Sequence, residues 1–319
     1  MQHPDLSVII CTYNRAHLLY RIFNDLNNQL FSDQQRFSFE LILVDNNSID
    51  DTKKVVHDFA IRSNFIVRYV FEPRQGKSFA LNTGVAAAAA ELLAFTDDDV
   101  IIDKKWLSSV YSAFCDYPRY NCFGGKILPI LEKPLPNWLS VTDRKFRVYG
   151  GPLVSHDRGD EVKEYDDTMY VPVGCNMFVR RFLFEKFGGY STKLGFYSQE
   201  ALIYSEDSEI MFRFKRGGEP ILHYPYALIQ HPVPADRMRK SYFKKWWWGV
   251  GRGNARWLSV PQGAIRYFNI PRYMIRDFMI NLLKWLIFLP SKKIYKRFYY
   301  ELHLIYKLGM FFELYTNGD

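Results

Sequence analysis

The strongest constraint in this sequence is an alternation of apolar and amphipathic segments over its first 130 residues. Short apolar runs typical of buried strands occupy residues 6–11, 40–44, 65–71 and 91–95. Segments with helical periodicity lie between them, at residues 16–30, 51–63 and 77–90. Strand–helix alternation of this kind predicts a parallel α/β sheet with helices on both faces.

Ligands of such sheets bind beyond the carboxyl ends of the strands, so the residues that follow each strand are the first candidates for function. These segments are polar here: 12–15, 45–48, 72–74 and 97–99. The sequence therefore predicts a binding site at this edge of the sheet.

Asp97, Asp98 and Asp99 directly follow the fourth apolar run. Adjacent carboxylates repel one another unless a cation offsets them, and hard divalent metals prefer oxygen ligands, so we expect a metal site. A solvated acidic turn before a helix near Lys104 is the structural alternative. Haloacid-dehalogenase-type phosphatases also use Asp-x-Asp after a strand, but on their first strand rather than the fourth.

The alternation ends after Lys126. Residues 142–170 are polar and contain glycine, which predicts an irregular loop. Further on, we expect helices at 180–187 and 206–216, and a strand at 221–230. Beyond Asp236, three helical segments follow, separated by prolines at positions 261, 271 and 290.

Several motifs occur in a fixed order between residue 6 and about residue 232. They are 7–15, 44–52, 82–84, 95–99, 174–181, 187–190, 206–210 and His231. In this order they resemble family 2 glycosyltransferases with the GT-A fold. The family's commoner Asp-Asp-Gly-Ser after the second strand is Asp45-Asn46-Asn47-Ser48 here, and Asn tolerates the left-handed backbone of such a turn.

The resemblance implies a nucleotide-sugar site. Thr12 and Asp45 would contact the nucleotide base, with Arg74 as a further contact. Asp97 and Asp98 would lie by the ribose and the diphosphate. The donor would be a nucleotide-diphosphate sugar, with a UDP-sugar favoured.

The resemblance also implies the catalytic groups. Asp99, with Asp97 and His231, would hold Mn²⁺ or Mg²⁺ on the diphosphate, and Asp207 would be the general base. Taken alone, an acidic pair that opens a helix is favoured by the helix dipole, and a lone His after a strand is more often structural. The Gln-x-x-Arg-Trp motif of processive members is absent, which favours transfer of a single sugar.

The charge of the chain is divided unevenly. The whole chain carries 42 Lys and Arg against 34 Asp and Glu, but residues 1–232 hold 26 against 29 (−3) and residues 233–319 hold 16 against 5 (+11). The basic part interleaves cations with aromatics, as in the Trp-rich run 240–248 and in the apolar segments 273–289 and 294–315. We expect this part to bind an anionic membrane surface rather than nucleic acid, with packing on the catalytic domain as the alternative.

Two glycine-containing segments resemble nucleotide-binding motifs but do not match them. Gly76-Lys77-Ser78 resembles the end of a P-loop, but Phe71 stands where the first glycine belongs. The glycines from Gly249 to Gly253 follow no strand, so close helix packing or a bend explains them better than a dinucleotide fingerprint.

We therefore expect an α/β protein with a GT-A-type, Rossmann-like mixed sheet flanked by helices and a C-terminal helical, basic-aromatic extension. The catalytic domain would span 1–232, with a nucleotide-sugar half at 1–130 and an acceptor half at 131–232. The membrane-associating extension would span 233–319.

The expected activity is inverting transfer of one sugar to a hydroxyl of a lipid-linked or saccharide acceptor. Scattered cysteines and the lack of a signal-like start favour a cytoplasmic protein, peripherally bound to the inner face of the membrane. The alternatives are a metal-dependent phosphatase or nucleotidyltransferase that uses the Asp triplet, and an inactive membrane-bound protein that binds sugar nucleotides.

Overall fold

The structure is a computed structural model that describes residues 3–31, 37–140, 142–166, 170–196, 202–257 and 260–316. The chain forms two compact units, each built from separate stretches of sequence. The first comprises 1–130, 156–192 and 206–232, and the second comprises 131–155, 193–205 and 233–319.

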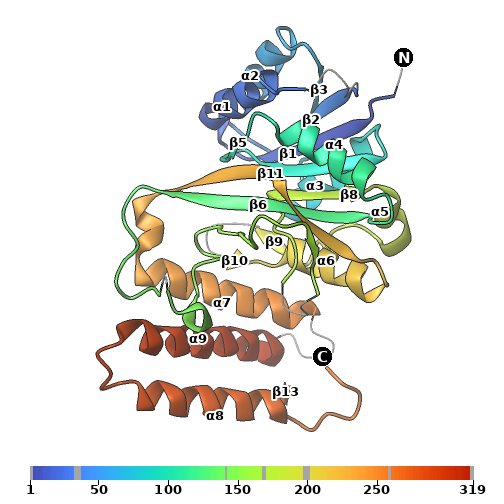
Figure 1. Ribbon diagram of the computed structural model, residues 1–319. Coiled ribbons are helices and arrows are strands. Elements are labelled where there is room, and N and C mark those ends of the chain that lie inside the picture. The colour runs from blue at the N-terminus through green and yellow to red at the C-terminus, as the bar shows by residue number, and fades with distance from the viewer. Residues whose placement is uncertain are drawn as a thin grey trace. The chain divides into compact units, whose positions relative to one another are not determined.

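A mixed sheet forms the centre of the first unit (Figure 1). Its strands are β1 (Leu6–Thr12), β2 (Phe39–Asp45), β3 (Ile66–Phe71), β4 (Leu92–Asp97), β5 (Ile101–Ile102), β6 (Cys122–Leu131), β7 (Lys163–Glu164), β8 (Asn176–Arg180) and β11 (Ile221–Val233). The order is β3-β2-β1-β4-β8-β6-β11-β5, and β7 pairs with β11. The first four are parallel, whereas β8 pairs antiparallel with both β4 and β6. The predicted mixed α/β fold is confirmed.

The strand order reverses next to β1, and this reversal positions the site. The chain moves from β1 outward to β2 and β3, then returns to place β4 on the other side of β1. Right-handed connections then put α1 (Ala16–Asn27) and α2 (Thr52–Ala60) on one face and α3 (Lys77–Ala87) on the other. The carboxyl ends of β1 and β4 therefore flank the crevice where open α/β sheets bind ligands.

The three helices predicted within the first 130 residues begin where expected but end about one turn early. In α3 the cause is visible, because the alanine run that favours a helix leaves it at Ala88, where ψ is 132°. The next two backbone N–H groups bond to buried side chains instead, Ala89 to Glu40 Oε1 at 2.7 Å and Ala90 to Ser7 Oγ at 3.0 Å. Tertiary hydrogen bonds thus override local propensity here.

Two sequence predictions need correction. β3 was expected to be buried, but it is the edge strand, and Ile66 and Phe71 are about half exposed. The segment 142–170 was expected to be irregular, yet its described part contains a 3₁₀ turn at Arg144–Phe146 and β7, and buries Leu153 and Tyr165.

Further helices of the first unit come later in the chain. α4 (Trp106–Asp116) follows β5, while α5 (Phe182–Phe187) and α6 (Glu206–Arg216) follow β8. α6 has the predicted bounds, and β11 extends the predicted strand to Val233.

The second unit contains three long helices, as predicted. They are α7 (Lys240–Trp257), α8 (Arg272–Ile287) and α9 (Ile294–Thr316), and α9 lies between α7 and α8 (Figure 1). A 3₁₀ turn at Ala235–Met238 precedes α7, and the short hairpins β9 (Gly195–Phe196)/β10 (Leu202–Ile203) and β12 (Arg266–Tyr267)/β13 (Ile270–Pro271) complete the unit. None of the helices in the described residues is long and apolar enough to cross a bilayer.

The glycines of α7 allow its backbone to approach its neighbours closely. A Cβ on Gly251 would lie 2.1 Å from the carbonyl oxygen of Tyr306 in α9, and one on Gly253 would lie 1.8 Å from that of Tyr204. The expected packing role of the glycine run 249–253 is confirmed, although the run lies inside α7 rather than between helices.

Gly84 offers a test of how α3 docks on the sheet. A Cβ at this position would lie 2.6 Å from Ile9 Cγ2 and 3.2 Å from Val44 Cγ2. Helix propensity alone would make Gly84→Ala stabilising by about 1 kcal/mol, but overpacking costs about 1–3 kcal/mol. We expect net destabilisation in chemical denaturation. Tyr20→Ala, at an exposed position of α1, is the propensity control and should not destabilise the protein.

Candidate active site

The aspartate triplet lies at the carboxyl end of β4, beside the end of β1. Asp97 Oδ1 accepts a hydrogen bond from Lys77 Nζ at 2.9 Å. Asp98 is almost fully buried, and it accepts hydrogen bonds from Thr12 Oγ1 at 2.6 Å and from the Arg15 guanidinium at 2.9 Å. Burial raises the pKa of Asp98, whereas the charge of Arg15 and the hydrogen bond from Thr12 oppose that rise. Thr12 and Asp98, both predicted on the nucleotide side, are therefore in direct contact, and their roles stay predictions.

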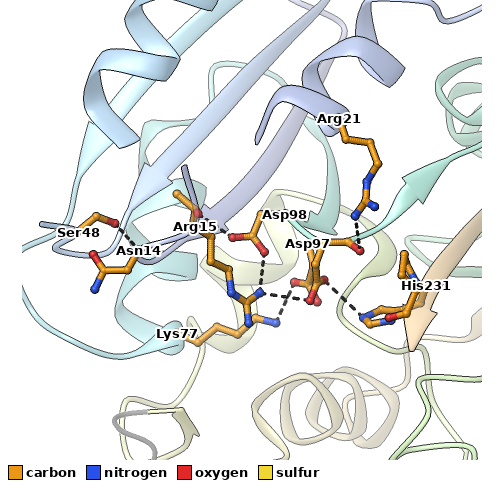
Figure 2. A network of polar contacts seen from close by, with 11 residues as sticks. Asn14, Arg15, Arg21, Ser48, Lys77, Asp97, Asp98 and His231 are labelled. Atoms are coloured by element: carbon orange, nitrogen blue, oxygen red, sulfur yellow. Dashed lines mark hydrogen bonds and ion pairs between the residues drawn. The ribbon is translucent and has the colours of Figure 1, made fainter. Parts of the chain in front are cut away.

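Asp99 faces a histidine from a distant part of the chain. His231 Nε2 lies 3.5 Å from Asp99 Oδ1, and Arg15 lies 3.2 Å from the other carboxylate oxygen. Arg21 of α1 donates to the backbone carbonyl of Asp99 at 3.0 Å. Figure 2 shows Lys77 and Arg15 reaching the cluster from one side and His231 from the other.

His231 is oriented for ligation. Its Nδ1 lies 2.9 Å from the carbonyl oxygen of Pro232, which can only accept, so Nδ1 carries the proton. In the neutral ring Nε2 then presents its lone pair toward Asp99, an arrangement typical of metal-binding histidines. Asp99 and His231 therefore fit a divalent cation as a pair.

The third predicted metal ligand is placed differently. Asp97 forms an ion pair with Lys77, and no group of three His, Cys, Asp or Glu side chains in the described residues is close enough to hold an ion. Assignment of Asp97 to the metal stays a prediction.

A small cavity beneath the triplet joins it to the start of α6. Its walls comprise Cys11, Lys77, Leu81, Phe95, Thr96, Asp97, Gly174, Tyr190, Glu206 and Asp207. The predicted base Asp207 thus lines the same cavity as Asp97, although the two residues are far apart in the sequence. Asp207 is held by backbone N–H groups, those of Gly174 at 2.8 Å and Ser208 at 2.7 Å.

Lys77 and Glu206 complete this charged cavity. Burial lowers the pKa of Lys77, but the charges of Asp97 and Glu206 outweigh it, and the pKa stands well above its usual value. Burial and the charge of Asp207 raise the pKa of Glu206 to about 7, although Lys77 opposes the rise. Glu206 therefore keeps a proton to a much higher pH than an ordinary glutamate.

The other predicted base contacts lie on the β2 and β3 side of the edge. Asp45 accepts hydrogen bonds from Tyr69 Oη at 2.7 Å and from the backbone N–H of Ser48 at 2.8 Å. Arg74 makes a bidentate pair with Glu72, at 2.8 Å and 2.7 Å, which is the largest factor that lowers the pKa of Glu72 to about 2. These hydrogen bonds hold Asp45 and Arg74 on this side of the edge, and their role in base binding stays a prediction.

Asn46 and Asn47 form and stabilise the turn after β2. Asn47 adopts φ of 67°, as the tolerance of Asn for left-handed backbone predicts. Asn46 is buried, donates to the carbonyl oxygen of Arg74 at 2.7 Å and accepts from the backbone N–H of Gly76 at 2.8 Å. It thereby fixes the loop that leads into Lys77.

Asn82 joins the two halves of the motif series. Its side chain accepts from the backbone N–H of Tyr190 at 2.7 Å and donates to the carbonyl oxygen of the same residue at 2.9 Å. A Cβ on Gly189 would lie 2.4 Å from Asn82 Oδ1, so glycine is needed there. The buried Tyr190 is thereby held in the cavity wall.

Sequence reasoning missed Lys77, Glu206 and the cluster role of Arg15. One signal for Lys77 was available, because a lysine in the first turn of a helix opposes the helix dipole and needs an anionic partner. Glu206 resembled an ordinary acidic first turn, and only its burial distinguishes it.

Comparison with known proteins assigns the chain to a family. The sequence model of glycosyl transferase family 2 matches residues 7–188. The chain belongs to glycosyltransferase family 2. The enzyme is thus a glycosyltransferase, and the phosphatase and nucleotidyltransferase alternatives are set aside.

Two curated relatives have names that specify lipid-linked sugars. A glucosyl-dolichyl phosphate glucuronosyltransferase of Haloferax volcanii is 21% identical over 253 residues, which cover 77% of this chain and 76% of the relative. The GalNAc(5)-diNAcBac-PP-undecaprenol β-1,3-glucosyltransferase of Campylobacter jejuni is 37% identical over 97 residues, 30% of each chain.

A solved structure supports the fold. One similar structure is the mannosyltransferase PcManGT of Pyrobaculum calidifontis in complex with GDP-Man and Mn²⁺. It superposes with a TM-score of 0.56 at 19% sequence identity, and the match covers 82% of this chain and 67% of the PcManGT chain. The predicted GT-A-type fold of the enzyme is therefore confirmed.

The pKa of Glu206 predicts a dependence of stability on pH. Its folded-state pKa lies above the unfolded value near 4.5, so its contribution is fully present below about pH 4.5 and is lost as pH rises through about 7. The decrease in the free energy of unfolding that Glu206 causes approaches about 3 kcal/mol. Chemical denaturation in EDTA at pH 5 and pH 8 should show this decline in the wild type, and a smaller one in Glu206→Gln. Equal declines in both proteins would contradict the assignment.

Proposed function

We propose that the enzyme transfers one sugar from a nucleotide-diphosphate sugar to a hydroxyl of a lipid-linked or saccharide acceptor, with inversion at the anomeric carbon. Asp207 is the general base of this proposal. Asp98, Thr12, Asp45 and Arg74 belong to the nucleotide side of the site, as the family resemblance implies. The observation that carries the proposal is the cavity that Asp207 shares with Asp97 and Lys77.

The chemical step follows from these groups. The acceptor hydroxyl transfers its proton to the Asp207 carboxylate while its oxygen attacks the anomeric carbon. The bond from that carbon to the diphosphate oxygen breaks, and the nucleoside diphosphate leaves with the bonding electrons. One base without a carboxylate nucleophile gives a single displacement, which inverts the configuration.

Two groups beside Asp207 support its role. Its backbone hydrogen bonds fix the carboxylate, so a nearby acceptor meets a base with little freedom to rotate. Glu206 holds its proton up to about pH 7, which limits the negative charge next to Asp207 in the cavity. Lys77 offsets the charge on the Asp97 side.

The geometry of Asp99 and His231 supports a divalent cation, Mn²⁺ or Mg²⁺, with Asp97 as a further candidate ligand. A bound divalent cation would supply Lewis-acid stabilisation of the departing diphosphate. His231, fixed by the carbonyl of Pro232, and Asp99, fixed by Arg21, would hold it. The Mn²⁺ complex of the Pyrobaculum neighbour is consistent with this proposal.

Lipid-linked acceptors are favoured by the names of the Haloferax and Campylobacter relatives. Such acceptors reside in a membrane, and the basic segment 233–319 would hold the enzyme peripherally at its inner, cytoplasmic face. The nucleotide is UDP, which the sequence favours, or another such as the GDP of the Pyrobaculum complex.

A screen of nucleotide sugars for metal-dependent release of nucleoside diphosphate tests the proposal. Release of pyrophosphate or phosphate would contradict it.

Asp207→Asn tests the base. A positioned base contributes about 10²–10⁴-fold, so we expect kcat to fall by that factor while donor binding, measured by calorimetry, stays unchanged. Asp116→Asn, which alters an exposed carboxylate on α4, is the matched control and should retain activity. Near-normal turnover in Asp207→Asn would remove Asp207 as the base.

Asp99→Asn tests the cation site. Loss of a charged ligand should raise the Mn²⁺ concentration needed for half-maximal activity at least about ten-fold. Titration of Mn²⁺ by electron paramagnetic resonance provides a readout independent of turnover. An unchanged Mn²⁺ affinity in the variant would show that Asp99 is not a ligand.

A further inference from the structure

α8 carries an apolar face that the described residues of the second unit leave exposed to solvent. Its exposed side chains are Met279, Ile280, Leu283, Leu286 and Ile287, and the last of these is 69% exposed. Their spacing places them on one face of the helix. Five neighbouring large apolar side chains in solvent are unusual for a surface helix and mark an interaction site.

The opposite face of α8 is already used. Met274 is buried against Met310 of α9, and the ring of Phe278 lies 5.6 Å from that of Phe311. Packing within the second unit therefore accounts for one apolar face and leaves the other without a role.

The Trp-rich run of α7, which the sequence made the first candidate for membrane contact, packs inside the second unit. The ring of Trp247 lies 5.0 Å from His303, and that of Trp248 lies 5.6 Å from Phe312. A Cβ on Gly151 would lie 2.2 Å from the ring of Trp246. These tryptophans are half-buried. The exposed apolar surface of this unit is therefore on α8 and not, as the sequence suggested, on the Trp-rich run of α7.

The hairpin before α8 extends this surface with a strained aromatic tip. Its two turn residues, Phe268 and Asn269, have φ of 49° and 64°. Such turns favour Asn and Gly, and a phenylalanine there is disfavoured. Phe268 is nevertheless 81% exposed, so no packing compensates for its backbone. The backbone N–H of Arg272 donates to the carbonyl oxygen of Ile265 at 2.8 Å, which ties the hairpin to the start of α8.

Positive charge borders both ends of the apolar face. Residues 266–297 contain one acidic side chain, Asp277, which lies near Arg276 and Lys307. The same range contains eight basic residues: Arg266, Arg272, Arg276, Lys284, Lys292, Lys293, Lys296 and Arg297. A second copy of the chain would set these cations against each other, whereas an anionic bilayer complements them.

We propose that the outward face of α8, with the tip of the β12–β13 hairpin, is the surface that binds an anionic lipid bilayer. Met279, Leu283 and Ile287 enter the boundary between headgroups and acyl chains, and Phe268 inserts beside them. Lys292 and Lys293 contact lipid phosphates. This inference rests on the proposed function, because it assigns the membrane contact of an enzyme with a lipid-linked acceptor.

The test is binding of the full-length protein to vesicles of phosphatidylcholine with phosphatidylglycerol, and to vesicles of phosphatidylcholine alone. The wild type should prefer the anionic vesicles, and added salt should weaken binding. Leu283→Glu/Ile287→Glu and Lys292→Glu/Lys293→Glu should each lower affinity at least about ten-fold. The matched controls in the first unit are Ile61→Glu, an exposed apolar position, and Lys53→Glu/Lys54→Glu, an exposed lysine pair; both should bind as wild type.

Phe268→Gly separates binding from folding. Glycine relieves the left-handed backbone, so the thermal midpoint should stay equal or rise while vesicle affinity falls. A lower midpoint with unchanged affinity would overturn the role of the hairpin tip.

Other outcomes overturn the inference as a whole. The first is absence of wild-type binding to anionic vesicles, and the second is wild-type affinity in both Leu283→Glu/Ile287→Glu and Lys292→Glu/Lys293→Glu. The third is a concentration-dependent oligomer that Leu283→Glu/Ile287→Glu dissociates while vesicles stay unbound. Metal-dependent release of nucleoside diphosphate in solution is measured in parallel. Loss of vesicle binding with intact turnover in the two double variants supports the inference. Vesicle binding without any turnover in the wild type contradicts only the proposed function.

Discussion

The balance of charge at the carboxyl edge of the sheet governs the architecture of this enzyme. Asp97, Asp98 and Asp99 occupy consecutive positions, and Glu206 and Asp207 line the cavity beneath them. Like charges at such separations cannot all persist without compensation. Lys77 and Arg15 supply it, and the raised pKa of Glu206 reduces the negative charge that this residue adds. Elements from both halves of the motif series therefore have to assemble before the site is stable.

The compensating cations, Arg15 and Lys77, are located at the N-terminal ends of two helices. Arg15 immediately precedes α1, and Lys77 is the first residue of α3. The two helices lie on opposite faces of the sheet, yet both begin at its carboxyl edge, so their first turns converge on the triplet. A lysine at this point is unfavourable for an isolated helix and becomes favourable only beside Asp97.

The sequence predicted the parts of the fold that depend on local pattern. Strands β1, β2 and β4, the helix starts and the bounds of α6 follow from apolar periodicity and polar boundaries. The position of β3 at the edge did not, because its apolar run resembles that of a buried strand and only strand order distinguishes the two. The early end of α3 also escaped prediction, since it depends on Glu40 and Ser7.

Some residues of the candidate site were likewise predictable from the sequence and others were not. Asp97–Asp99, Asp207 and His231 were predicted because ordered motifs named them, and the structure brings Asp99 to His231 and Asp97 to the cavity of Asp207. Lys77 and Glu206 became visible only with burial and distance. The orientation of the Trp-rich run in α7 was equally beyond pattern, because tryptophans with lysines between them fit both a lipid surface and a helix interface.

Asn46 has a consequence for how this family member can diversify. Its amide donates to the carbonyl oxygen of Arg74 and accepts from the N–H of Gly76, and the Gln75 side chain adds a longer hydrogen bond of 3.4 Å to its Oδ1. An aspartate, which occupies this position in the commoner family motif, could accept from Gly76 but could not donate to the carbonyl. Because the bond from Asn46 to Arg74 uses the backbone, a change of the Arg74 side chain leaves it in place. The path of the loop before Lys77 is therefore insensitive to which side chain stands at position 74.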